Sequence, residues 1–373
     1  MNEYMNVLES FGESRSINDI LDFKKIIFFG AGESSNEAFK YFNKKGKEII
    51  AYFDSNVNLH GNKKNNIKIY NPINIKEMVE FNNAAVVITS SYQHEISIEL
   101  TERYGVSQDK IFPYITEMFS KHFNPALISD NYSKIKRVNN YFGDYESINY
   151  FNSLIKFRWT MNPLFLKPNS KIKGFFQYDN SKLGPQYGDY IIDCGAYIGD
   201  TVELYINRLD RKCKIYAIEA YPPNYERLLY TIKQNKIEGN VIPLNIAVDS
   251  KPGTIKMPIS DRNINPRKSI KDTSNANYFE VNVDTIDGLV EKLKIPKIDF
   301  IKMDIEGSEL EALKGAANTI KKYKPSLVLS AYHVPEHIWE LVDMAKKLNN
   351  NYKIFAGHHP KCIYEIEYYL YNK

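Results

Sequence analysis

Glycines and acidic side chains stand at the ends of three short apolar runs in the second half of the chain. The run YIID ends at Asp193 and leads into CGAYIGDT, which contains Gly195 and Gly199. Two later runs, KIYAIE and FIKMD, end at Glu219 and Asp304. Ligands of open parallel sheets bind beyond the carboxyl ends of the strands, where a carboxylate can accept hydrogen bonds from a ribose diol. We therefore expect a ribose-containing ligand at this edge.

The composition of the turn favours a cationic ligand over a dinucleotide. Dinucleotide sites prefer GxGxxG, whose amides face phosphate. Here the turn reads DCGAYIG, with the acid Asp193 in front and Tyr197 where a glycine would often stand. A strand-end acid disfavours phosphate, so S-adenosylmethionine, which has a sulfonium and no phosphate, fits better than NAD. We also expect Asp200 and Glu203 to form a capping box at the start of the next helix.

The bulk composition is that of a soluble globular protein without a demand for nucleic acid. The 373 residues are 43% hydrophobic and 25% charged, and the formal net charge is only +4. The three cysteines lie far apart without a CxxC pair, which favours a reducing compartment. The sequence shows neither a membrane-spanning apolar run nor a signal-peptide core. We expect a cytoplasmic protein without a transmembrane segment.

Strand-like and helix-like runs divide the chain into four parts. Residues 1–22 are expected to form a leading helical segment, and 23–115 a small Rossmann-like α/β domain. Residues 116–185 form a helical bridge, and 186–373 a second, larger α/β domain. Within the latter, the polar segment 260–278 is expected to be a surface loop, with a lid or acceptor-recognition loop as the alternative.

The second domain shows the alternation of strands and helices that a parallel sheet requires. The runs YIID, KIYAIEA, VIPLNIAV, DFIKMD and SLVLSAY are expected to be strands, and the chain ends in a predicted hairpin. Residues 309–323 carry one apolar stripe and are expected to form one helix. Residues 335–348 carry another stripe, through Ile338, Leu341 and Ala345.

Taken together, these motifs give the second domain a family resemblance. DYIIDCGAYIGDT, YAIEAYPPNYERL, LNIAVD, VDTID, IDFIKMDIEGSELEALKGA and KIFAGHH resemble the FkbM family of S-adenosylmethionine-dependent methyltransferases over residues 175–371. The resemblance implies a class I methyltransferase fold, with a seven-stranded sheet whose last strand is antiparallel. It also implies O-methylation of hydroxyl groups on sugars, glycans or natural products.

The resemblance also implies a set of cofactor-binding positions. Residues of the turn would surround the methionine part of S-adenosylmethionine, Glu219 would bind the ribose, and small residues after the next strands would line the adenine. Asp304 would lie near the transferred methyl group. The full set is Tyr178, Asp193, Gly195, Ala196, Tyr197, Gly199, Thr201, Glu219, Ala220, Ala247, Val248 and Asp304.

Candidate catalytic groups follow the fourth and fifth strands and the last hairpin turn. Asp304, His333 and His359 are the predicted catalytic residues, because a weakly acidic hydroxyl needs a base or a metal during attack. An unperturbed His333 would have a pKa near 6.5, which suits a base. Glu306 is expected to cap the helix that follows. A divalent metal on Asp304, Glu306 and His333 is compatible with the spacing but not demanded by it.

The N-terminal domain carries a second glycine turn. FFGAGESS contains Gly30 and Gly32, with Ser35 in place of a third glycine, and Asp54 ends the next strand. This pattern resembles the small Rossmann-like domains that precede sugar-modifying transferases. Two interpretations stay open: a module for a nucleotide, a sugar-nucleotide or the acceptor, and an empty scaffold or oligomerisation domain.

The leading hypothesis is an S-adenosylmethionine-dependent O-methyltransferase acting on a sugar, a nucleotide-sugar or a surface glycan, in polysaccharide biosynthesis. One alternative is an NAD-dependent sugar-nucleotide oxidoreductase or epimerase that uses the turn at Gly30. Another is a non-catalytic cofactor-binding assembly subunit. The expected partner is a small-molecule or glycan acceptor, and a homo-oligomer is left open.

Overall fold

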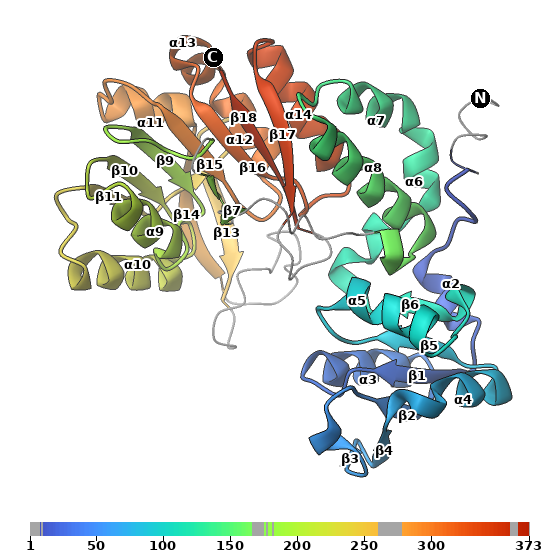
Figure 1. Ribbon diagram of the computed structural model, residues 1–373. Helices are drawn as coiled ribbons and strands as arrows, with labels where there is room; N and C mark the ends of the chain where they lie inside the picture. Colours follow the sequence, from blue (N-terminus) through green and yellow to red (C-terminus); the bar gives the residue numbers. More distant parts are fainter. Residues whose placement is uncertain are drawn as a thin grey trace. The chain divides into compact units, whose positions relative to one another are not determined.

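The computed structural model describes most of the chain as two compact units (Figure 1). The first contains the described residues up to 139 together with 148–165, and the second contains 140–147 and the described residues from 175 onward. The expected loop at 260–278 lies outside the described residues except for its last position. The described residues are 8, 10–165, 175–176, 178–180, 183–259, 278–358 and 365–372.

The first unit is built on a six-stranded sheet with the order β3-β4-β2-β1-β5-β6. Strands β4, β2, β1, β5 and β6 run parallel, and β3 pairs antiparallel with β4. Buried apolar side chains fill the central strands, as expected for a parallel sheet covered on both faces. The strands are β1 (Lys25–Phe29), β2 (Glu48–Phe53), β3 (Lys63–Lys64), β4 (Ile67–Tyr70), β5 (Ala85–Ile88) and β6 (Ile111–Pro113).

Helices precede, separate and follow the strands of this sheet in the sequence. Of the expected leading helical segment, α2 is described, and the Ser16 side chain caps it. Within the expected bridge at residues 116–185, the described residues form three α-helices and two short strands. The helices are α2 (Ile17–Leu21), α3 (Ser34–Lys44), α4 (Ile75–Asn82), α5 (Gln93–Ile98), α6 (Pro125–Asp130), α7 (Tyr132–Asn139) and α8 (Tyr145–Thr160).

The chain's own side chains contact the glycine turn after β1. The Asp54 carboxylate accepts a hydrogen bond from the amide of Ala31 at 2.7 Å. The Lys64 ammonium donates to the carbonyls of Ala31 and Gly32, both at 2.6 Å. The acid at the end of the second strand therefore binds the turn itself in this structure.

The second unit contains a seven-stranded sheet with the order β11-β10-β9-β15-β16-β18-β17. The first five are parallel, and β18 runs antiparallel to both β16 and β17. This confirms the sheet and the terminal hairpin expected from the sequence. The strands are β9 (Tyr190–Cys194), β10 (Lys214–Ile218), β11 (Val241–Leu244), β15 (Phe300–Met303), β16 (Ser326–Ser330), β17 (Lys353–His358) and β18 (Ile366–Tyr371).

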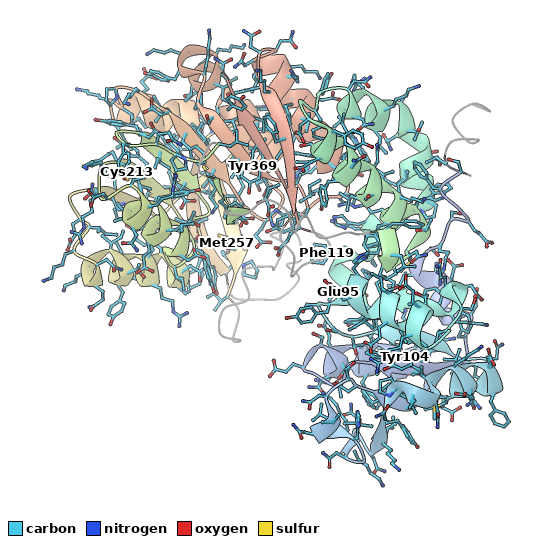
Figure 2. The ribbon with its side chains drawn as sticks, in the orientation of Figure 1. Glu95, Tyr104, Phe119, Cys213, Met257 and Tyr369 are labelled. Carbon is cyan, nitrogen blue, oxygen red and sulfur yellow. The ribbon has the colours of Figure 1, made fainter. Side chains whose placement is uncertain are left out.

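Helices cover both faces of this sheet (Figure 1). Side chains of α9 and α10 share one apolar core with residues of six strands, among them Tyr369, and with Cys213 just before β10. Figure 2 labels both residues. Helices α11 to α14 contact one another on the opposite face. The helices are α9 (Asp200–Arg208), α10 (Pro222–Gln234), α11 (Ile286–Lys292), α12 (Glu309–Gly315), α13 (Ala317–Tyr323) and α14 (His337–Leu348).

Short strands add two further sheets to this unit. One has the order β12-β14-β13 and stands beside the carboxyl end of β11 along the chain. The other is a two-stranded pair next to Tyr178. Their members are β7 (Phe175–Phe176), β8 (Asp179–Asn180), β12 (Ala247–Val248), β13 (Gly253–Pro258) and β14 (Tyr278–Asp284).

The edge strand β17 is paired with a segment from far earlier in the chain. Phe142 forms a parallel bridge with Ile354, whose carbonyl accepts from the amide of Gly143 at 3.2 Å. The amide of Ala356 donates to the Ser147 hydroxyl at 3.0 Å. Residues 140–147 therefore cover part of the outer edge of the sheet.

The single helix expected over residues 309–323 is wrong, because the structure has two helices that meet at Ala316. At this break Gly315 packs directly on the backbone of Asp249. A Cβ atom at Gly315 would lie 2.2 Å from the Asp249 carbonyl oxygen. The backbone of α12 at Gly315 therefore lies closer to the backbone of Asp249 than any residue with a Cβ atom would allow.

No helix among the described residues is long and apolar enough to cross a membrane.

We predict that Gly315→Ala destabilises the protein by about 1–3 kcal/mol, the usual cost of forcing extra volume into a packed contact. The backbone of Asp249 or helix α12 must move to relieve the overlap. Urea denaturation of the full chain measures the free energy of unfolding. Gly239→Ala is the control, because a Cβ atom there meets nothing within 4 Å. Equal stability of the two variants would contradict the close approach.

Candidate active site

A cavity of about 470 Å³ opens at the carboxyl ends of β9, β10 and β15. Its walls come from the loops after these strands and from the small sheet of β12, β13 and β14. Most of the predicted cofactor-binding residues line it. They are Tyr178, Gly195, Tyr197, Thr201, Glu219, Ala220, Ala247, Val248 and Asp304.

Three predicted residues lie behind this wall instead of in it. Asp193 and Ala196 are fully buried. Gly199 is the N-cap of α9, with φ of +94°. These residues shape the turn without lining the cavity. The predicted catalytic residue His359 lies outside the described residues.

The turn after β9 depends on a close approach between two strand ends. Gly195 has φ of +81°, and a Cβ atom there would lie 1.9 Å from the carbonyl oxygen of Asp304. The amides of Gly195 and Ala196 both donate to the Ile218 carbonyl at 2.9 Å, and the Asp304 amide donates to the Cys194 carbonyl at 3.1 Å. The turn is therefore fixed against both neighbouring strands.

The capping box expected at Asp200 and Glu203 is wrong. The N-cap of α9 is Gly199, which offers no side chain, and Asp200 is already the first helical residue. The Glu203 side chain accepts a hydrogen bond from the Asn235 amide instead. Packing of Gly199 against Leu228 and Thr231 of α10 places the start of the helix one residue earlier than the capping box would.

Glu219 points its carboxylate into the cavity wall between two backbone amides. One oxygen accepts from the amide of Tyr197 and the other from that of Tyr221, each at 2.9 Å. The residue is only 7% exposed. Burial raises the pKa of Glu219 to about 7, although these two amides and Lys302 work in the opposite direction.

A buried ion pair lies beneath the turn. Lys302 on β15 is the register partner of Asp193 on β9, so the two side chains share one face of the sheet. The Lys302 ammonium lies 3.0 Å from an Asp193 oxygen and donates to the carbonyl of Gly195 at 2.7 Å. Burial lowers the pKa of Lys302, but the carboxylates of Asp193 and Asp304 outweigh it and raise that pKa.

Two tyrosines orient the carboxylate of Asp304. The Tyr178 hydroxyl donates to one oxygen at 2.7 Å, and the Tyr332 hydroxyl donates to the other at 3.2 Å. Burial and the adjacent Asp304 raise the pKa of both phenols. Both tyrosines are therefore held as neutral donors, and Asp304 keeps a defined orientation at the cavity.

His333 follows β16 and lies close to Asp304. Its Nε2 lies 3.4 Å from an Asp304 oxygen and 3.6 Å from a Glu306 oxygen. Its Nδ1 lies 2.8 Å from Glu309. Burial lowers the pKa of His333, but Glu309, then Asp304 and Glu306, outweigh it and raise the pKa to about 9. The expected neutral base is thus a cation near pH 7.

The helix cap expected at Glu306 is wrong, because the N-cap of α12 is Ser308, whose side chain makes no capping hydrogen bond. Glu309, the first residue of α12, instead binds the loop before the helix. One Glu309 oxygen accepts from the amides of Ile305 and Gly307 at 2.9 and 3.3 Å. Its other oxygen lies 3.2 Å from His337. Burial would raise the pKa of this fully buried acid, but His333 and His337 hold it well below its usual range. Glu306 instead has φ of +55° and lines the cavity.

A metal ion has limited room in this cluster. Asp304, Glu309 and His333 offer ligand atoms within 4.8 Å of one another. Both Glu309 oxygens already face donors of the chain. A cation could use Asp304 and, after displacing its proton, Nε2 of His333, with a Glu306 oxygen 3.6 Å from that nitrogen.

Comparison with known proteins agrees with this architecture. Residues 193–354 match the family model described as the Methyltransferase FkbM domain, and residues 22–112 match the one described as C2185-like, N-terminal. The hexuronic acid methyltransferase AglP of Haloferax volcanii is 29% identical over 178 residues, which are 45% of this chain and 70% of AglP.

A solved structure shares the fold over nearly the whole length. It is the methyltransferase FkbM of Methylobacillus flagellatus KT, with a TM-score of 0.73 and 18% sequence identity. The match covers 99% of this chain and 98% of that chain.

We predict that Glu309→Gln lowers the pKa of His333 from about 9 toward the usual value near 6.5, because the strongest partner of the imidazolium loses its charge. NMR titration of protein labelled at histidine measures this pKa. Glu311→Gln is the control on the same helix, since Glu311 is partly exposed to solvent and pairs with Lys314. An unchanged His333 titration in Glu309→Gln would contradict the network.

Proposed function

We propose that this chain, an S-adenosylmethionine-dependent methyltransferase with a domain of the FkbM family, methylates a hydroxyl group of a sugar, a nucleotide-sugar or a surface glycan. The observation that carries this proposal is Asp304, an oriented carboxylate at the cavity beside the glycine turn. The likeness to a hexuronic acid methyltransferase supports a sugar acceptor. We further propose polysaccharide biosynthesis in the cytoplasm as its setting.

The cavity fits the methyl donor in its shape and its charge. Glu219 offers a buried carboxylate for the ribose hydroxyls, and Ala220, Ala247 and Val248 offer a small apolar wall for the adenine. The close approach of Gly195 to the Asp304 carbonyl places the glycine turn and Asp304 next to each other in the cavity lining. Acidic side chains predominate around the cavity, which suits a sulfonium and disfavours a pyrophosphate.

The chain's own residues would act on the acceptor in three ways. Bound S-adenosylmethionine would supply a methyl group attached to a positively charged sulfur. That sulfur would become a neutral thioether once the methyl group passes to the acceptor oxygen. Asp304 accepts the hydroxyl proton as the carbon–oxygen bond forms. Tyr178 and Tyr332 keep its two oxygens oriented, and the His333 cation offsets negative charge at the neighbouring carboxylates.

A divalent cation is compatible with this reaction but not demanded by it. The sulfonium methyl is already activated, so alignment and exclusion of water provide much of the rate. If a cation binds, Asp304, Glu306 and His333 would hold it. It would then supply Lewis-acid stabilisation of the acceptor oxygen.

We predict methylation of a sugar hydroxyl in a screen of neutral sugars, uronic acids, nucleotide-sugars and glycan fragments, read by mass spectrometry. Each acceptor is assayed with Mg²⁺ and with a chelator, and the comparison decides whether the reaction requires a divalent metal.

Asp304→Asn should lower kcat about 10²–10⁴-fold, because the proton acceptor is lost. Asp210→Asn, at an exposed ion pair, is the control. Full activity of Asp304→Asn would refute the role of Asp304, and methylation confined to non-sugar acceptors would refute the substrate class.

We predict that the affinity for S-adenosylmethionine rises with pH through about 7 and then levels off. The ribose hydroxyls need the ionised form of Glu219, whose pKa is about 7, so protonation below that pH removes their acceptor. Calorimetry from pH 5.5 to 8.5 measures the trend, and a hydrogen bond to a charged group is worth about ten-fold or more. Glu219→Gln should abolish the pH dependence, while Glu226→Gln on the exposed side of α10 should retain it.

A further inference from the structure

Lys302 is the one cation that reaches the cavity among the described residues that line it. The same lining carries six acidic side chains. They are Asp200, Glu219, Asp249, Asp304, Glu306 and Glu365. S-adenosylmethionine brings a sulfonium, an α-ammonium and an α-carboxylate to this surface. The acids can accommodate the two cationic groups, but the carboxylate needs a positive partner.

Other anion sites at this end of the cavity are unfavourable. The amino terminus of α9 has no side-chain cap, yet Asp200 and Glu203 stand in its first turn and repel an anion. The amides of Tyr197 and Tyr221 are already bonded to Glu219. Among the described lining residues, Lys302 supplies the one positively charged side chain for the carboxylate.

The described contacts of the Lys302 ammonium do not use all of its N–H donors. An ammonium has three N–H donors. Its described oxygen partners are the carbonyl of Gly195 at 2.7 Å and an Asp193 oxygen at 3.0 Å. The ammonium also lies 4.9 Å from the centre of the ring of Tyr178, which lines the cavity as Lys302 does. One of the three N–H donors therefore has no oxygen partner among those described.

We propose that the Lys302 ammonium, held by Asp193 and the Gly195 carbonyl, is the subsite that receives the α-carboxylate of S-adenosylmethionine. Lys302 then has two roles, because it also neutralises the buried Asp193. The inference rests on the methyl donor and not on the acceptor. Its failure is therefore distinguishable from failure of the proposed sugar substrate.

The test compares S-adenosylmethionine with its decarboxylated form, which lacks only the carboxylate. Calorimetry measures both dissociation constants for the wild-type protein and for the double variant Asp193→Asn/Lys302→Met. The double variant removes the ammonium without changing the net charge of the cavity, and it leaves no unpaired buried charge. Raised salt suppresses the remaining long-range electrostatics. Thermal unfolding verifies that both proteins are folded.

We expect the ratio of the two dissociation constants to shift about ten-fold or more against S-adenosylmethionine in the double variant. Lys302→Arg, which keeps a cationic donor, should retain most of the wild-type ratio. If both ligands weaken equally, so that the ratio is unchanged, Lys302 is only a counter-ion for Asp193 and the proposal is overturned.

A measurement on the wild-type protein guards against variants that fail to fold. With ¹⁵N-labelled lysine, the ammonium signal of Lys302 should shift when S-adenosylmethionine is added. The decarboxylated donor should produce a much smaller shift at equal saturation. Equal shifts with the two ligands would overturn the proposal without the use of any variant.

Discussion

The site depends on the contact between the turn after β9 and the end of β15. Gly195 lies so close to the Asp304 carbonyl that a Cβ atom would overlap it at 1.9 Å. This approach aligns the two strands so that Asp193 faces Lys302 and Asp304 stands beside the turn. The turn proposed to receive the donor's methionine end and the proposed proton acceptor are thus positioned by a single backbone contact, which explains why only glycine serves at this position.

Charge around this contact is arranged in pairs rather than as isolated groups. Lys302 lies against Asp193, and His333 lies against Glu309, each with burial opposing ionisation and a partner favouring it. Removing one member would leave the other buried and unpaired, which costs more than the pair itself contributes. Asp304 and Glu306 line the cavity beside these pairs.

Features that are local in the chain could be predicted from the sequence, and features made across strands could not. The strand ends, Glu219, Asp304, the order of elements and the methyltransferase assignment followed from motifs. Lys302 was hidden in the apolar run FIKM, where only its register with Asp193 reveals it. Glu309 lies in an apolar helix pattern, and its function depends on His333, which is far away in sequence. The capping box failed because helix packing at Gly199 decided where α9 begins.

The pairing of residues 142–147 with the edge strand β17 affects where the chain could be shortened. Residues 142–147 satisfy the amide of Ala356 and the carbonyl of Ile354 on the outer edge of the sheet. A shortened chain that begins at residue 175 would keep every residue of the cavity but expose that edge. An uncovered strand edge is a template for pairing with other chains. A shortened chain that keeps this edge covered therefore begins before residue 142, well ahead of the first predicted cofactor motif.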